Sequence, residues 1–160
     1  MFLWFAGLSF AAVWSVFRSP ALDHRMVMLG AVLPLCEAFA GRPLALHTLA
    51  GATALMTVVM LATRRRRLLR RRWLGIPVGL YAHLVLDATW ADKHLFWWPF
   101  LGAGFAERSL PEVRPWPVVV VLELAGAAVL VWMVRTFRLT EPERRSDFVR
   151  TGRLGRDLIA

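Results

Sequence analysis

The sequence contains a single cysteine, one lysine and only 11 acidic residues. Because Cys36 is alone, the chain can form neither an internal disulfide nor a thiolate metal cluster. It also lacks a G-x-S-x-G nucleophile motif and a phosphate-binding loop, which argues against a serine hydrolase and against a nucleotide-binding enzyme. No positively charged stretch or clear cleavage site accompanies the first apolar run. We therefore expect that run to be a retained membrane span rather than a secretory signal.

The sequence is instead rich in apolar residues and in arginine. Of the 160 residues, 58% are hydrophobic, and the mean hydropathy is +0.51. The apolar residues form long unbroken runs, as a lipid environment requires. The net charge of +9 is concentrated in two arginine-rich patches beside apolar runs, at residues 64–73 and 135–156. The positive-inside rule explains this distribution and argues against nucleic acid as a partner.

The apolar runs predict an all-α integral membrane bundle with five transmembrane helices in one domain, residues 1–138. The predicted spans are Phe2–Phe17, Met26–Ala40, Leu44–Thr63, Leu74–Ala91 and Pro117–Phe137. The first, second and fourth are short for a hydrocarbon core of about 30 Å and require tilt or a thin bilayer. The arginine patches place the N-terminus outside and the C-terminus in the cytoplasm. Residues 139–160 are predicted to be a basic cytoplasmic tail, either a surface helix or a disordered arm near anionic lipid.

Five ionisable side chains fall at similar depth in the outer half of this predicted bundle, because successive spans alternate in direction. They are Glu37, His47, His83, Asp87 and Glu123. His83 and Asp87 are four residues apart and therefore share a helix face. Ionisable groups within a membrane cost several kcal/mol unless they face a cavity or one another, so they mark candidate functional sites. His24 and His94 lie at other depths and stay outside the group.

The chemistry of this group predicts a divalent-metal site that faces the outer side. Carboxylates with neutral imidazoles are ligands for zinc, manganese or iron. Structural interpretations remain open for each residue. His47 could be a capping or interfacial histidine, and His83 with Asp87 could be a hydrogen-bonded pair that joins helices. Glu123 could pair with an arginine of the outer loop, Arg108 or Arg114.

Three stretches of sequence resemble a known family. They are LGAVLPLCE (residues 29–37), LHTL (46–49) and GLYAHLVLDATW (79–90) with the downstream WWPF (97–100). This pattern resembles the YdjM-like proteins of bacterial inner membranes, in a short actinobacterial-type branch. The resemblance covers about residues 22–104, and H-x-x-x-D followed by W-P-F is its most specific part. It implies a multi-pass protein of the cytoplasmic membrane with metal-dependent hydrolase activity.

The resemblance also implies the ligand set. The candidate metal ligands that carry over are Glu37, His47, His83 and Asp87. The sequence departs from the family pattern at Leu35, which replaces the first acidic residue of the LPDxD motif, while Glu37 occupies the second acidic position. A histidine found near the family's N-terminus has no counterpart in the first span.

The resulting hypothesis is a membrane-bound, metal-dependent hydrolase, in which Glu123 is a general base or a partner of the ligands. Its expected partners are membrane lipid and a lipid-linked or phosphoester substrate, and a homo-oligomer is left open. The alternative is a non-catalytic membrane protein whose histidine and acid cluster is structural or contacts a partner subunit.

Overall fold

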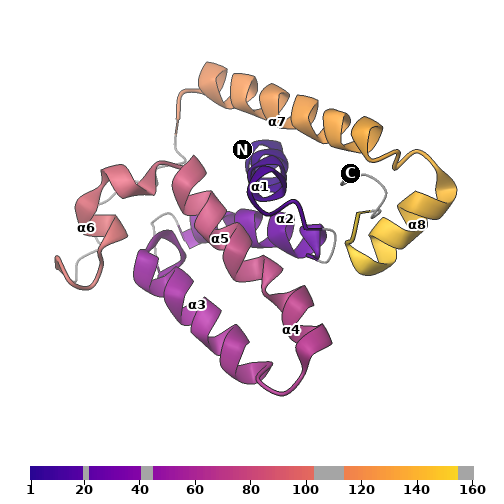
Figure 1. Ribbon diagram of the computed structural model, residues 1–160. Helices are drawn as coiled ribbons and strands as arrows, with labels where there is room; N and C mark the ends of the chain where they lie inside the picture. The colour runs from indigo at the N-terminus through magenta and orange to yellow at the C-terminus, as the bar shows by residue number, and fades with distance from the viewer. Residues whose placement is uncertain (20–21, 41–44, 103–113, 155–160) are drawn as a thin grey trace.

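A computed structural model describes residues 1–19, 22–40, 45–102 and 114–154. Within these ranges the regular structure is helical, as the sequence predicts. The elements are α1 (Phe2–Phe17), α2 (His24–Val32), η1 (Leu33–Ala40), η2 (Ala45–His47), α3 (Leu49–Ala62), α4 (Arg67–Trp73), α5 (Gly75–Leu86), η3 (Thr89–Ala91), α6 (Lys93–Phe96), α7 (Trp116–Thr136) and α8 (Pro142–Thr151). Helix α1 lies between α7 and α2, whereas α6 and α8 lie at opposite ends of the molecule (Figure 1).

Short polar residues begin the helices that lead to the site. Asp23 starts α2 by accepting hydrogen bonds from the backbone N–H groups of Arg25 and Met26. Thr48 starts α3 by accepting one from Gly51 at 2.9 Å. Such caps satisfy N–H groups that have no partner within the helix. After α2 the chain continues as the 3₁₀ helix η1, which contains Pro34; because proline lacks an N–H, it interrupts the α-helical hydrogen-bond pattern.

Helices α2 and α5 cross with their backbones in direct contact. A Cβ atom on Gly79 would lie 2.0 Å from the carbonyl oxygen of Val27, and one on Gly30 would lie 2.0 Å from that of Ile76. Only glycine fits at these two positions. Small residues at helix crossings are typical of packing within membranes, where close backbone approach strengthens van der Waals contact.

Contacts between helices give the chain direction of each one. Helices α2 and α5 run the same way, since the approach of Gly79 to Val27 is followed one turn later by a hydrogen bond from His83 to Ala31. Helix α3 runs the opposite way, since its first turns approach the last turns of α5 through Thr53, whose hydroxyl lies 2.9 Å from that of Tyr81.

Helix α7 runs opposite to α2, and α1, which is seen nearly end-on in Figure 1, crosses between them. The backbone N–H of Leu3 donates to Glu123 in α7, and Phe10 packs further along against Phe137. The ring of Trp14, near the end of α1, lies 5.8 Å from that of His24 at the start of α2. The bundle thus has two ends. We call the end with His47, His83 and Asp87 the histidine end, and the end with residues 64–72 and α8 the arginine end.

The predicted spans coincide with helical segments, but three of them are interrupted. The second passes from α2 to η1 at Leu33, and the third, whose first residue lies outside the described part, consists of η2 followed by α3. Within the fourth, Leu74–Ala91, α5 ends at Asp87 and Ala88 has a positive φ of 57° before η3. Among the described residues, α7 is long and apolar enough to cross a bilayer, while α1 and α3 are apolar but shorter. The five-span arrangement therefore stays a prediction.

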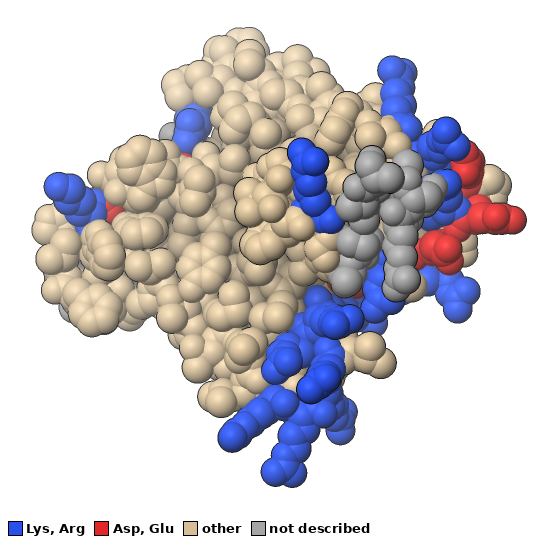
Figure 2. Space-filling view, viewed as in Figure 1, with Lys and Arg blue, Asp and Glu red and all other residues tan. Residues whose placement is uncertain are grey.

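The predicted basic tail packs against the bundle over its described part. Leu139 and Leu154, which flank α8, are buried in one cluster with Phe10, Met133 and Phe137. The C-terminal end of α8 contacts the start of α2, where the backbone N–H of His24 donates to the carbonyl oxygen of Gly152 at 2.9 Å. Figure 2 shows the arginines gathered over the α3–α4 hairpin and α8, with most of the remaining face uncharged.

Candidate metal centre

Three of the predicted ligands meet at the histidine end. His47, His83 and Asp87 each offer one ligand atom, and these atoms lie within 4.8 Å of one another. The three residues are buried, with exposed fractions of 0%, 0% and 2%. Helix α5 supplies His83 and, as the residue that ends it, Asp87, whose backbone N–H donates to the His83 carbonyl at 2.8 Å. The predicted shared face is confirmed, and the separate segment η2 adds His47.

Glu37 holds His47 in place from behind. One Glu37 oxygen, Oε2, lies 2.6 Å from His47 Nδ1, and the other accepts a hydrogen bond from the backbone N–H of Leu46 at 2.8 Å. The carboxylate therefore contacts the nitrogen of His47 on the far side from Nε2. The three clustered ligand atoms do not include a Glu37 oxygen. In this geometry Glu37 orients the ring of His47, while its predicted role as a metal ligand stays a prediction.

His83 is oriented by a backbone carbonyl. Its Nδ1 lies 2.7 Å from the carbonyl oxygen of Ala31 in α2. Because a carbonyl only accepts, Nδ1 carries the proton and Nε2 is left as the nitrogen that can bind a metal. The ring of Phe5 covers that of His83 at 4.0 Å between centroids. Histidine ligands typically donate their second ring nitrogen to a carboxylate or a carbonyl, and both histidines of this group follow that rule.

Asp87 is contacted by Arg114, which the sequence analysis considered only as an alternative partner of Glu123. Arg114 Nη2 lies 3.6 Å from Asp87 Oδ1 and 3.4 Å from the Asp87 carbonyl oxygen. The Arg114 side chain is 34% exposed, whereas that of Asp87 is fully buried. The guanidinium thus lies between the carboxylate and the surroundings. Among the described residues, Arg114 is the cation that contacts Asp87.

The Glu123 side chain, in α7, contacts the start of α1. Its Oε1 lies 3.0 Å from the Met1 amino nitrogen, and its Oε2 accepts a hydrogen bond from the Leu3 backbone N–H at 2.8 Å. The alternative pairing with Arg114 is not seen, because Arg114 contacts Asp87, and Arg108 lies outside the described residues. From this position Glu123 holds α1 against α7. Its role as a general base stays a prediction.

Sequence reasoning missed the two contacts that orient His83 and Asp87. The Ala31 carbonyl carries no side-chain signal, although Gly30 and Gly79 are small residues that permit α2 and α5 to approach so closely. Arg114 was considered only for its nearness in sequence to α7. The charge balance of the outer loop gives no means of choosing between Asp87 and Glu123 as its partner.

The donor set fits a divalent cation. Two imidazoles and one carboxylate suit zinc, manganese or iron, and catalytic zinc sites use three protein ligands where structural sites use four.

A family model described as "YdjM inner membrane protein" matches residues 5–144, a stretch that includes each of the site residues described above except Met1 and Leu3. Comparison with curated proteins and with solved structures gives no match.

Proposed function

Because the chain belongs to the family of YdjM inner membrane proteins, we propose that it is a metal-dependent hydrolase whose centre lies at the histidine end. The convergence of His47, His83 and Asp87 in a buried group carries this proposal. Burial of a carboxylate is costly, and a bound cation would add to the compensation that Arg114 gives Asp87 from 3.6 Å. A divalent ion in this group would supply Lewis acidity for hydrolysis.

The remaining residues of the site have separable tasks. Glu37 fixes the ring of His47 and favours the protonated Nδ1, which leaves Nε2 for the metal. Ala31 does the same for His83 through its carbonyl oxygen. Phe5 covers the His83 ring and excludes water from that side. Together these contacts hold the ligands before a metal binds, which reduces the cost of ordering them.

Arg114 points to an anionic substrate. A partly exposed guanidinium beside the ligand carboxylate is placed to bind a phosphoryl oxygen, because guanidinium groups form paired hydrogen bonds with phosphate. A phosphoester attached to a membrane lipid carries the negative charge that would pair with Arg114, and it lies in the membrane, where proteins of this family are located. We assign a lipid-linked phosphoester as the substrate class.

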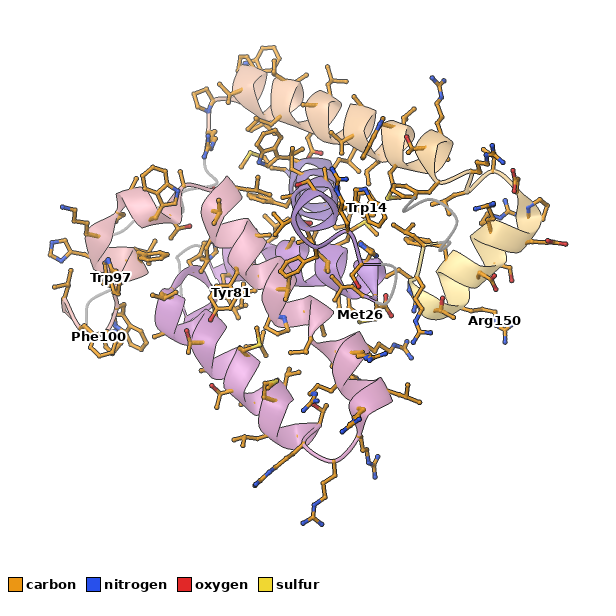
Figure 3. All side chains as sticks on the ribbon, viewed as in Figure 1. Trp14, Met26, Tyr81, Trp97, Phe100 and Arg150 are labelled. Atoms are coloured by element: carbon orange, nitrogen blue, oxygen red, sulfur yellow. The ribbon has the colours of Figure 1, made fainter. Side chains whose placement is uncertain are left out.

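The orientation proposed for the chain is five spans with the metal centre toward the outer side. Support comes from the alternating directions of α2–η1, α3, α5 and α7 between the two ends of the bundle. The arginines of residues 64–72 and α8 lie at the end expected in the cytoplasm. At the other end Trp97 and Phe100 lie beside α6, far from Arg150 on α8 (Figure 3). Exposed aromatic residues of this kind are typical of the membrane–water interface.

A non-catalytic role is the second candidate, and two contacts favour it. The Glu37–His47 hydrogen bond and the Asp87–Arg114 ion pair are contacts that would also join helices in a purely structural cluster. The two functions differ in one measurable respect. A catalytic centre binds a stoichiometric cation through Nε2 of both histidines, whereas a structural cluster needs none.

The deciding experiment is the metal content of the full chain purified in detergent, measured by inductively coupled plasma mass spectrometry. We expect close to one zinc, manganese or iron ion per chain, and background levels in the double variant His83→Ala, Asp87→Ala. His94→Ala is the matched control, because His94 is an exposed histidine outside the group, and it should keep the wild-type content. Absence of metal from the wild type after reconstitution with excess cation would refute the hydrolase proposal.

The Arg114→Gln variant tests the substrate class separately. It should keep its metal but lose about 10- to 100-fold of its activity toward a chromogenic phosphodiester, the loss expected for one charge-assisted hydrogen bond. Loss of metal from this variant would instead show that Arg114 supports the ligands.

A further inference from the structure

A polar cavity of about 220 Å³ opens at the arginine end, where the start of α2, helix α4 and the end of α8 meet. Its charged lining consists of one carboxylate and four guanidinium groups: Asp23, Arg25, Arg72, Arg150 and Arg153. We call this cavity the arginine pocket. It lies at the opposite end of the bundle from the metal centre and shares no residue with it.

The single carboxylate of the arginine pocket, Asp23, is already paired with residues of the bundle. Asp23 caps α2 and pairs with Arg25 at 2.8 Å and with Arg72 at 3.6 Å. Within the described part of the chain, Arg150 and Arg153 have no carboxylate partner. The pocket therefore keeps an excess of positive charge that only an anion from outside the described structure would offset.

The pocket is built by specific contacts rather than by chance proximity of surface arginines. Arg25 donates from Nη1 to the carbonyl oxygen of Val149 and lies with its Nε against Asp23 at 3.1 Å, which fixes α8 to α2. At Gly152 the approach is so close that a Cβ atom would lie 1.7 Å from Asp23 Oδ1. The ends of three helices are thus held together around the cavity.

An apolar groove begins directly beside the arginine pocket. Leu22 and Arg71, the sequence neighbours of Asp23 and Arg72, line a cavity of about 390 Å³ with Phe17. A second cavity of about 330 Å³ shares Phe17 with the first and continues between α1 and α5 as far as Leu86. A strongly basic pocket therefore opens next to a long apolar groove between two helices.

The geometry points to an anionic phospholipid as the ligand of the arginine pocket, with its phosphodiester on the guanidinium groups and an acyl chain in the groove between α1 and α5. Guanidinium groups bind phosphate oxygens in pairs, and basic pockets between membrane helices are typical sites for anionic headgroups. The groove favours a lipid over free phosphate, because a free ion makes no use of apolar surface. A bound headgroup would also hold α8 against α2 and α4.

The test uses the full chain reconstituted in nanodiscs of phosphatidylcholine, with or without phosphatidylglycerol. Native mass spectrometry should detect phosphatidylglycerol retained by the wild type after release into detergent, and the melting temperature should rise when this lipid is present. The variant Arg72→Gln, Arg150→Gln, Arg153→Gln should retain at least tenfold less lipid and lose the rise in melting temperature. Arg25 is left intact because it also fixes α8.

The matched control is Arg64→Gln, Arg65→Gln, Arg67→Gln, which removes the same charge from exposed positions that do not line the pocket. It should keep the lipid. Equal losses in the two triple variants would overturn the proposal, because general surface attraction would then explain the binding. A rise in melting temperature produced by inorganic phosphate in phosphatidylcholine alone would overturn the assignment to lipid. Metal content should be unchanged in both variants, so the result is independent of the hydrolase proposal.

Discussion

The two ends of this bundle hold their ionisable residues in opposite ways. At the histidine end, the three candidate ligand residues are almost fully buried, and the two histidines among them are each oriented by a hydrogen bond to Nδ1. At the arginine end, many like charges lie at the surface around one buried carboxylate, Asp23. Single contacts therefore determine the chemistry of the first end, whereas the second depends on the sum of several charges. Substitutions at the two ends should differ in size and in kind.

The largest effect among substitutions that keep all three ligands is expected for Glu37→Gln. The amide can still accept from the Leu46 N–H, but it no longer stabilises a proton on His47 Nδ1 as a carboxylate does. Removal of such an orienting contact typically weakens metal affinity 10- to 100-fold. Competition with a chelator of known affinity measures the change.

Cys36→Ser is the control for Glu37→Gln, because Cys36 is the exposed neighbour in the same 3₁₀ helix. Complete loss of metal from Glu37→Gln would identify Glu37 as a ligand in its own right. Unchanged affinity would show that the 2.6 Å contact to His47 has no part in metal binding.

A smaller effect, on stability rather than chemistry, is expected for Gly152→Ala at the arginine end. Gly152 has a φ of +68° and lies against Asp23, so a methyl group must displace the carboxylate or undock α8. Overpacking of this kind costs about 1–3 kcal/mol. Hydrogen–deuterium exchange in α8 should increase while the metal content stays the same.

Gly102→Ala separates the two causes of that loss. Gly102 also has a positive φ, +128°, but a Cβ atom there would meet no atom of the described residues within 4 Å. This variant carries backbone strain without a clash. Because a φ of +128° is at least as unfavourable for alanine as a φ of +68°, backbone strain alone predicts that Gly102→Ala loses no less stability than Gly152→Ala. A larger loss for Gly152→Ala would assign the excess to the docking of α8 on Asp23.

The same contrast between the two ends explains what the sequence could predict. Apolar runs and the four-residue spacing of His83 and Asp87 are local signals, and they predicted the helices and the shared face. The prediction that His47 of η2 lies near His83 and Asp87 of α5 needed only the assumption that the spans alternate in direction. The Ala31 carbonyl and Arg114 could not be assigned, because their roles depend on how closely α2 and α5 pack and on which carboxylate the loop reaches.

The smallest effect concerns His24, which precedes the second predicted span and was set aside because of its depth. Burial lowers the pKa of His24 below its ordinary value of 6.5, against the opposing effects of the Gly152 and Leu22 backbone and of Asp23. The unfolded chain then binds a proton more readily than the folded chain, so stability is full above pH 6.5 and falls as the pH drops toward the lowered folded pKa. The slope cannot exceed about 1.4 kcal/mol per pH unit for one proton.

Thermal unfolding of the wild type and of His24→Gln between pH 8 and pH 5 measures this slope. The histidines of the metal centre contribute equally to both proteins, so the difference between the two curves isolates His24. We expect the curve of the variant to be flatter below pH 6.5. Parallel curves would mean that His24 takes up its proton without strain between the rings of Phe10 and Trp14, and that the arginine end tolerates one more positive charge in its interior.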